Sequence, residues 1–148
     1  MNYVTLGKTG LKVAEVSFGG IPIQRSDAEN TRAVVDKLEQ YGMNYIDTAR
    51  GYTVSEEYLG AALEGRRDKF ILATKSMARG KESMAKDIDI SLKNLRTDHI
   101  DVYQIHNLPE AEIDKVFGEG GAWEALEEAK AYTKGRVQFG KPISKFQN

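Results

Sequence analysis

Four ionisable residues end or follow successive apolar segments of the sequence: Asp47, Tyr52, Lys75 and His106. A phenol can donate a proton to a carbonyl oxygen, a neighbouring ammonium favours loss of that proton, and an aspartate can hold the ammonium in place. A neutral imidazole can orient the carbonyl by hydrogen bonding. Together they predict a site that protonates a carbonyl oxygen while hydride reaches the carbon. The hydride must come from a cofactor, because no side chain donates one.

Each of these side chains also has a structural interpretation. Asp47 could bond the backbone of its own loop, and Tyr52 could pack that loop. Lys75 could be solvated at a strand end, and His106 could be a buried histidine with its hydrogen bonds satisfied. Taken singly, the structural interpretation is the better one for each residue. Only their joint position at successive strand ends favours a functional site.

Hydrophobic periodicity predicts the elements that would position these residues. A hairpin is expected from strands at residues 3–6 and 11–16, joined by a glycine-rich turn. Further strands are expected at residues 16–21, 43–47, 70–75 and 99–106, and helices at residues 26–41, 55–63, 82–94 and 122–132. Ser26 with Glu29 is typical of a capping box, Ser55 is expected to cap the second helix, and Gly42 to close the first.

The alternation of strands and helices predicts an α/β fold with a parallel sheet and right-handed crossovers. Polar residues gather at the carboxyl ends of the strands, where βα folds build their sites. No GxGxxG motif follows a strand, which argues against a doubly wound dinucleotide-binding sheet. The Gly-Lys-Thr at residues 7–9 is not a phosphate loop, because Asn2 stands where that motif requires glycine. We expect a partial (β/α)₈ barrel of about four βα units.

Composition narrows the function further. The 148 residues carry a net charge of −1, which gives no bulk attraction for nucleic acid or an acidic membrane. The absence of cysteine excludes disulfides and thiolate metal sites, and two histidines without an HExxH pattern argue against a zinc site. No long apolar run or signal peptide is present, so a cytoplasmic protein is expected.

Several longer motifs resemble those of the aldo-keto reductases, NAD(P)H-dependent enzymes on a (β/α)₈ barrel. They are LGKTGLKV at residues 6–13, DTA at 47–49 with Tyr52, SEEYLG at 55–60, ATK at 73–75, SLKNL at 91–95 with Thr97 and Asp98, and IDVYQIH at 100–106. The resemblance covers about residues 1–130. It implies an oxidoreductase that reduces small aldehydes or ketones to alcohols with NADP(H) or NAD(H).

The same resemblance implies roles for individual residues. Tyr52 would be the general acid, Asp47 and Lys75 would tune it, and His106 would orient the substrate. The first cofactor-contacting loop of the family corresponds to Gly19, Gly20 and Ile21, with Asp47 beside it. No residue is assigned to a metal.

The chain departs from the family in length. A (β/α)₈ barrel needs about 250 residues, and the main phosphate- and adenosine-binding segments of the family lie in its later strands. We therefore expect half a cofactor pocket and an impaired reductase. The alternatives are a non-catalytic truncated or chimeric domain, or a subunit completed by another polypeptide. Open sheet edges would favour self-association.

Residues 131–148 form a tail that departs from the family pattern. The tail resembles a segment of acyl-CoA dehydrogenases, whose part corresponding to residues 136–140 contacts flavin. Residues 134–137 could instead begin the fifth strand of a reductase barrel, but Pro142 fits poorly inside a central strand. We favour a divergent or chimeric tail, and we expect no flavin site from so short a segment.

Overall fold

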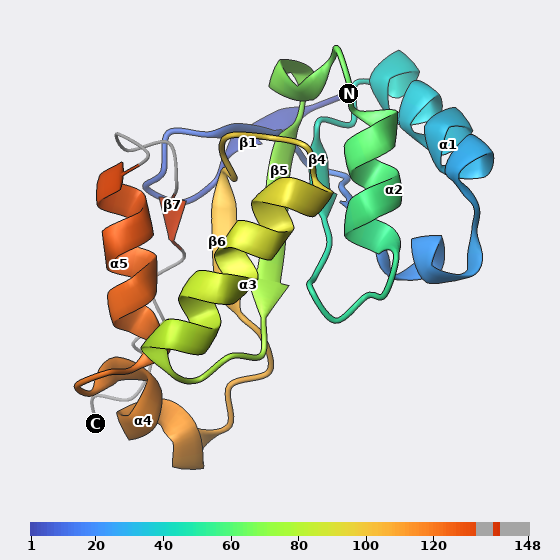
Figure 1. The fold of residues 1–148 in the computed structure, drawn as a ribbon. Helices are drawn as coiled ribbons and strands as arrows, with labels where there is room; N and C mark the ends of the chain where they lie inside the picture. The colour runs from blue at the N-terminus through green and yellow to red at the C-terminus, as the bar shows by residue number, and fades with distance from the viewer. Residues whose placement is uncertain (133–137, 140–148) are drawn as a thin grey trace.

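A five-stranded, all-parallel sheet forms the centre of the protein. The computed structural model describes residues 1–132 and 138–139. The strands lie in the order in which they occur along the chain: β3 (Phe18–Gly19), β4 (Tyr45–Asp47), β5 (Ile71–Ser76), β6 (Val102–Ile105) and β7 (Gln138–Phe139). The intervening helices are α1 (Ala28–Tyr41), α2 (Ser55–Ala62), α3 (Lys81–Asn94), the short α4 (Ile113–Phe117) and α5 (Ala122–Tyr132) (Figure 1). The predicted α/β class and parallel sheet are confirmed, and the arrangement is that of a partial barrel.

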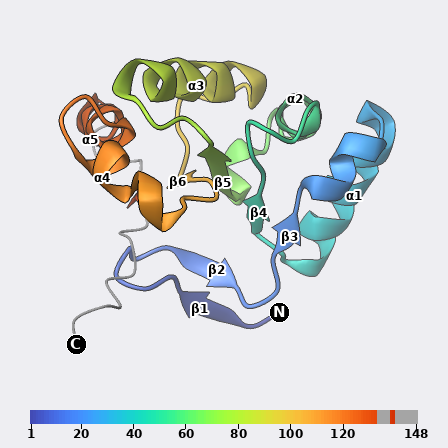
Figure 2. The same ribbon diagram turned by 90° about the horizontal axis from the view of Figure 1, so that it is seen from below.

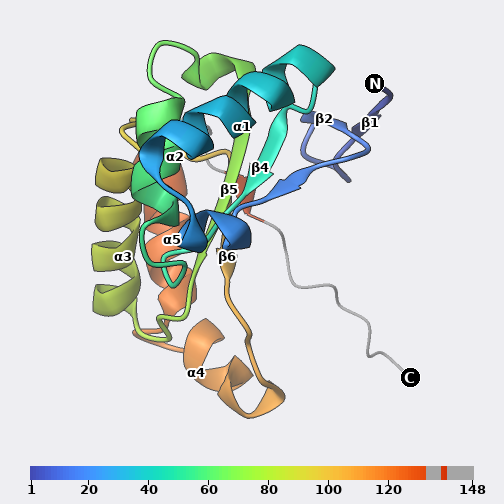
Figure 3. The same cartoon turned by 90° about the vertical axis from the view of Figure 1, so that its right-hand side faces the viewer.

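The helices cover one face of the sheet. Figure 2 shows α1, α2, α3 and α5 in an arc around the strands. The predicted hairpin is also present, as β1 (Tyr3–Thr5) and β2 (Lys12–Ala14), and it lies on the side of the strands opposite α3 (Figure 3). Asn44 fastens it just before β4, because its Oδ1 accepts from the Ala14 N–H at 2.8 Å and its Nδ2 donates to the Lys12 carbonyl at 2.9 Å.

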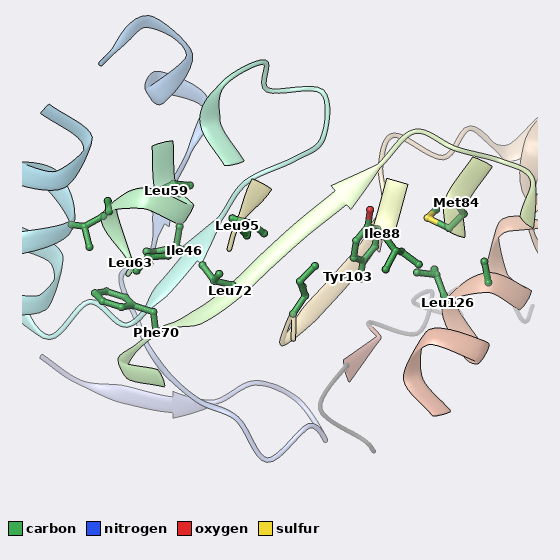
Figure 4. Close-up of a cluster of buried hydrophobic side chains, with 14 of the residues drawn as sticks. Ile46, Leu59, Leu63, Phe70, Leu72, Met84, Ile88, Leu95, Tyr103 and Leu126 are labelled. Atoms are coloured by element: carbon green, nitrogen blue, oxygen red, sulfur yellow. The ribbon is translucent and has the colours of Figure 1, made fainter. Parts of the chain in front are cut away.

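The apolar core fills the space between the helices and the sheet (Figure 4). Ile46 and Leu72 lie side by side in the register of β4 and β5 and are fully buried there. Side chains alternate between the two faces of a strand, so a residue one or three positions further along points to the opposite face. Asp47 follows Ile46 by one position, and Lys75 follows Leu72 by three. This places Asp47 and Lys75 on the face away from the helices. Burial on both faces explains the continuously apolar start of β5.

Both predicted serine caps are wrong. Asp27, not Ser26, is the N-cap of α1: its backbone is extended and its carboxylate accepts from the Asn30 N–H at 2.7 Å. Ser55 is the first residue of α2, and its hydroxyl donates to the carbonyl of Gly20 at 2.9 Å instead of capping its own helix. The closing residue of α1 is confirmed, since Gly42 has a left-handed φ of 73°.

The strand β6 is shorter than predicted. It begins at Val102 and not at His99, because Asp101 engages β5 through its side chain: the Asp101 carboxylate accepts from the Leu72 N–H at 2.8 Å and from Arg67 at 2.7 Å. The first strand of the sheet is shorter too, with only Phe18–Gly19 paired to β4. The short helix α4 was not predicted.

The segment predicted to diverge from the family is described only in part. Gln138–Phe139 pairs in parallel with Val102 and Tyr103, so a fifth strand does occur near the place that the sequence left open for one. Residues 133–137 and 140–148, including Arg136 and Pro142, lie outside the described residues. The resemblance of the tail to acyl-CoA dehydrogenases stays a prediction.

The outer edge of β3 has no strand partner in the described part of the chain. It is one of the open sheet edges through which self-association is expected; that expectation stays a prediction, which size exclusion with light scattering would test. Within the same residues, no helix is long and apolar enough to cross a membrane. No group of three or more histidine and acidic side chains in the described ranges is placed to hold a metal ion.

Candidate active site

The structure brings the four predicted site residues together at the carboxyl ends of the strands. Asp47 is the last residue of β4 and forms an ion pair with Lys75 of β5. The Lys75 ammonium lies 5.0 Å from the centroid of the Tyr52 ring. The Tyr52 and His106 rings meet edge to face, with centroids 5.8 Å apart and planes at 86°. A single chain of contacts therefore runs through all four.

Lys75 is held from two sides. Its side chain is nearly buried, with the residue 9% exposed. The ammonium donates to the Asp47 carboxylate and, at 2.8 Å, to the carbonyl of Thr48. The backbone of the same loop is tied to β5 as well, because the Arg50 N–H donates to the Lys75 carbonyl at 3.0 Å. The cation thus has little freedom to leave the Tyr52 ring.

Tyr52 lies in a tight turn between β4 and α2. Its N–H donates to the Ala49 carbonyl at 3.0 Å, and its carbonyl accepts from the Ser55 N–H at 2.8 Å. Thr53, directly after it, has a φ of 42°, in the left-handed region that non-glycine residues rarely adopt. Such strain persists only where surrounding contacts hold the turn.

A buried polar network provides some of the contacts that hold the Tyr52 turn. Arg50, in the Tyr52 turn, forms an ion pair with Glu56 of α2 at 3.3 Å and lies 3.6 Å from Asp87 of α3. Glu56 is 1% exposed, and its other carboxylate oxygen accepts from Thr74 of β5 at 2.8 Å and from Ser91 of α3 at 2.7 Å. The turn is therefore anchored to two helices and a strand.

The surroundings of His106 lower its pKa and so favour the neutral imidazole. Burial lowers the pKa of His106 most, the positive charge of Lys75 lowers it further, Asp47 opposes these effects, and Arg79 adds to the lowering. Its Nδ1 atom is buried with no hydrogen-bond partner among the described residues. An imidazolium would leave an N–H there without an acceptor, which agrees with the lowered pKa. Nε2 is left as the nitrogen that can contact a substrate.

In the predicted cofactor loop, Gly19 has free space beside it and Gly20 is tightly packed against the protein. Gly19 lies opposite Asp47 in the sheet register, and a Cβ built on it meets no atom within 4 Å. A Cβ on Gly20 would lie 2.9 Å from the Ser55 hydroxyl and 3.2 Å from the Asp47 carbonyl. Both backbone groups of Gly20 are already bonded within the protein. Ile21 is exposed and begins a short 3₁₀ helix.

Some residues that build the site were missed by sequence reasoning. Thr48 bonds Lys75 through its carbonyl and Ser55 through its hydroxyl at 2.9 Å. Arg79 donates to the carbonyls of His106 and Asn107. Thr48 sits inside the DTA motif, which is a signal that could have been used. Nothing in the sequence indicates the contacts of Ser55 with Gly20 or of Arg79 with His106, because the partners lie about 30 residues apart.

Comparisons with known proteins agree on one family. The model of the "Aldo/keto reductase family" matches residues 15–138. The chain is 32% identical over 129 residues to the aldo-keto reductase YhdN of Bacillus subtilis, an alignment that covers 72% of this chain and 38% of that protein. It is 34% identical over 130 residues to the L-galactose dehydrogenase of Arabidopsis thaliana, with 77% of this chain and 40% of that protein covered.

Solved structures show the same similarity. An aldo-keto reductase from Bacillus halodurans in its holo form matches with a TM-score of 0.80 and 31% identity, covering 95% of this chain and 49% of that one. An aldo-keto reductase from Klebsiella pneumoniae, solved in complex with NADPH, matches with a TM-score of 0.74 and 26% identity, covering 95% and 49%. The chain thus spans about two fifths of the curated relatives, and about half of these two solved chains.

Proposed function

The chain belongs to the aldo/keto reductase family, and on that basis we propose that the Asp47, Tyr52, Lys75 and His106 cluster reduces small aldehydes or ketones to alcohols with NADP(H) or NAD(H). The observation that carries the proposal is the placement of the Lys75 ammonium, paired with Asp47, over the ring of Tyr52. A cation beside a phenol suits proton donation better than simple packing of a loop does.

The chain offers a surface for the nicotinamide end of such a cofactor. The open space at Gly19 lets a ligand approach the backbone beside Asp47, which is the use of a glycine at a strand end. Ile21 follows with an exposed apolar side chain, and the closed packing of Gly20 keeps this loop in place. When bound, a reduced nicotinamide supplies hydride to the carbonyl carbon.

The proton that the reaction needs comes from a side chain of this protein. Tyr52 donates its hydroxyl proton to the carbonyl oxygen, so that the addition of hydride and proton gives the alcohol. The Lys75 ammonium stabilises the negative charge that develops on the Tyr52 oxygen, and Asp47 keeps Lys75 in position. His106 donates a hydrogen bond that orients the carbonyl, and its neutral form is favoured because burial and Lys75 lower its pKa.

The electrostatic contribution of Lys75 is limited. The Lys75 Nζ lies 5.0 Å from the centroid of the ring, and a unit negative charge placed at that centroid would gain about 3 kcal/mol at an effective dielectric constant of about 20. The paired carboxylate of Asp47 cancels part of this gain, so a contribution of about 1–2 kcal/mol is reasonable, which corresponds to roughly a tenfold effect on rate.

Titration of NADPH and of NADH into the protein, followed by nicotinamide fluorescence, tests cofactor binding. Turnover is then measured with a panel of small aldehydes. Tyr52→Phe should abolish turnover and leave cofactor affinity nearly intact, because it removes only the proton donor. Tyr58→Phe, the same change on the half-buried face of α2, is the matched control and should keep turnover.

Two results would contradict the proposal. The first is the absence of saturable binding of either cofactor up to roughly millimolar concentration, the upper end of common KM values. That result would favour the alternative of a non-catalytic family member. The second is unchanged turnover in Tyr52→Phe, which would refute the assignment of the proton donor.

A further inference from the structure

Arg79 lies in the loop between β5 and α3 and reaches across to the turn that follows β6. Its side chain is 9% exposed, and its Nε forms an ion pair with Glu112 at 2.6 Å. One terminal nitrogen of the guanidinium donates to two successive carbonyls, that of His106 at 2.9 Å and that of Asn107 at 2.7 Å. This cation is therefore committed to the backbone on which His106 stands.

The turn at this point needs such support. Asn107 has a φ of 47°, so the chain enters the left-handed region immediately after His106. Asparagine tolerates this conformation better than most residues, but it still carries a conformational cost. The turn also leaves the two carbonyls without strand partners of their own, and Arg79 satisfies both.

Burial of the Arg79 guanidinium costs free energy, which argues that its contacts with the His106 turn matter to the protein. The remaining terminal nitrogen of Arg79 is buried with no hydrogen-bond partner among the described residues. Burying a partly satisfied cation is unfavourable unless its other contacts compensate. Those contacts are Glu112 and the two carbonyls of the His106 turn.

We propose that Arg79 is a positioning residue for His106: its guanidinium fixes the turn from which the imidazole makes its edge-to-face contact with the Tyr52 ring. The inference rests on the proposed function for its purpose, because a carbonyl can be oriented only if the His106 and Tyr52 rings keep their relation. The geometry itself does not depend on that function. Glu112 in turn holds Arg79, which links the segment before α4 to the site.

The charges around His106 give the proposal a second readout. Lys75 from β5 and Asp47 from β4 face the imidazole together with Arg79. Burial lowers the pKa of His106, and the charge of Arg79 contributes to the lowering. If Arg79 holds the ring in place, its loss should relax both effects and raise the pKa of His106 toward that of an ordinary histidine.

The protein offers a matched internal control. It contains only two histidines, His99 and His106, which precede and follow β6. Arg67 donates to the carbonyl of His99 at 3.0 Å, much as Arg79 donates to that of His106. The variants Arg79→Met and Arg67→Met therefore each remove a guanidinium that binds the carbonyl of a histidine, at opposite ends of the same strand.

Proton NMR of the full chain reports on His99 and His106, at the two ends of β6, in one sample. In the unchanged protein we expect a cross-peak between the Tyr52 and His106 ring protons, because the rings are in edge contact. Arg79→Met should lose this cross-peak and move the His106 titration midpoint upward, and the signals of His99 should stay. Arg67→Met should shift the signals of His99 and leave the Tyr52–His106 cross-peak in place.

Arg79→Met overturns the proposal if it keeps both the cross-peak and the His106 midpoint. If that variant does not fold, which loss of the native His99 signals would reveal, Arg79→Lys decides. A point charge cannot bridge Glu112 and both carbonyls as a planar guanidinium does. A weakened cross-peak in Arg79→Lys supports the proposal, and an unchanged one overturns it. Neither measurement needs cofactor or substrate, so a failure of the proposed function would be seen separately.

Discussion

Glu56→Gln changes the charge of a buried side chain and almost nothing of its shape. Glu56 is 1% exposed, and four donors converge on it. One carboxylate oxygen accepts from the hydroxyls of Thr74 and Ser91, at 2.8 and 2.7 Å. The other accepts from Asn94 and Arg50, both at 3.3 Å. The carboxylate thereby joins α2 to β5, to α3 and to the turn that carries Tyr52.

The loss of stability follows from counting donors. A glutamine amide can accept at only one end. If that end stays with the Thr74 and Ser91 hydroxyls, the donors of Arg50 and Asn94 lose their acceptor; in the other orientation the two hydroxyls must turn to accept from the amide and no longer donate to residue 56. Each buried donor left unpaired costs about 1–3 kcal/mol. An amide is easier to bury than a carboxylate, which offsets part of this cost. We expect Glu56→Gln to lower the free energy of unfolding by about 2–3 kcal/mol, or Tm by roughly 5–10 °C.

Urea denaturation followed by the fluorescence of Trp123, the single tryptophan, measures the change. Glu57→Gln is the matched control, because Glu57 is the neighbouring residue in the first turn of α2 and is exposed. It should change the free energy of unfolding by less than about 0.5 kcal/mol, as surface substitutions usually do. Equal effects of the two substitutions, or a loss below about 1 kcal/mol for Glu56→Gln, would refute the reasoning from unpaired donors.

Three further predictions concern the contact between two helices, the titration of a buried tyrosine and the charges near His106. Gly60→Ala places a Cβ 2.2 Å from a backbone carbonyl oxygen of α3, so we expect a loss of about 1–3 kcal/mol in urea denaturation; an unchanged stability would contradict the close helix contact. Burial, with a contribution from Asp47, raises the pKa of Tyr45 to about 12, whereas an unfolded tyrosine titrates near 10. The neutral phenol therefore favours the folded state below pH 10, and stability should fall as the pH rises from about 10 to about 12, less steeply in Tyr45→Phe. Lys75→Met should raise the pKa of His106 and Asp47→Asn should lower it, because the two charges act on it in opposite directions; NMR titrations that move together would contradict this.

Much of the fold could be predicted because it depends on local patterns. Alternating apolar segments and turns placed the parallel strands and the main helices, and Gly42 marked the end of α1 through the left-handed φ that glycine adopts most easily. Errors arose where two local solutions compete. Ser26 and Asp27 are both good caps and both have an extended backbone. Only the folded chain decides between them, because the Asn30 N–H donates to the carboxylate of Asp27 and the Thr31 N–H donates to its carbonyl.

Longer-range contacts account for the other differences. β6 begins at Val102 because the Asp101 side chain accepts from the Leu72 N–H. Ser55 was expected to cap its own helix but bonds the carbonyl of Gly20, 35 residues away in the chain. Such pairings depend on which backbone groups remain unsatisfied once the sheet has formed, and that is not visible in a local stretch of sequence.

The sequence by itself determined the chemistry that is available and the order in which it is presented. A carboxylate, a phenol, an ammonium and an imidazole follow successive strands, and parallel strands bring their carboxyl ends to one edge of the sheet. Only the tertiary structure decided how these groups meet. It set the Lys75 ammonium over the Tyr52 ring, buried the Nδ1 of His106 without a hydrogen-bond partner in the described part of the chain, and bonded Arg79 to the turn that carries His106. The physical reason is that side-chain pairing requires contacts of a few ångströms between residues tens of positions apart, which only the packed chain provides.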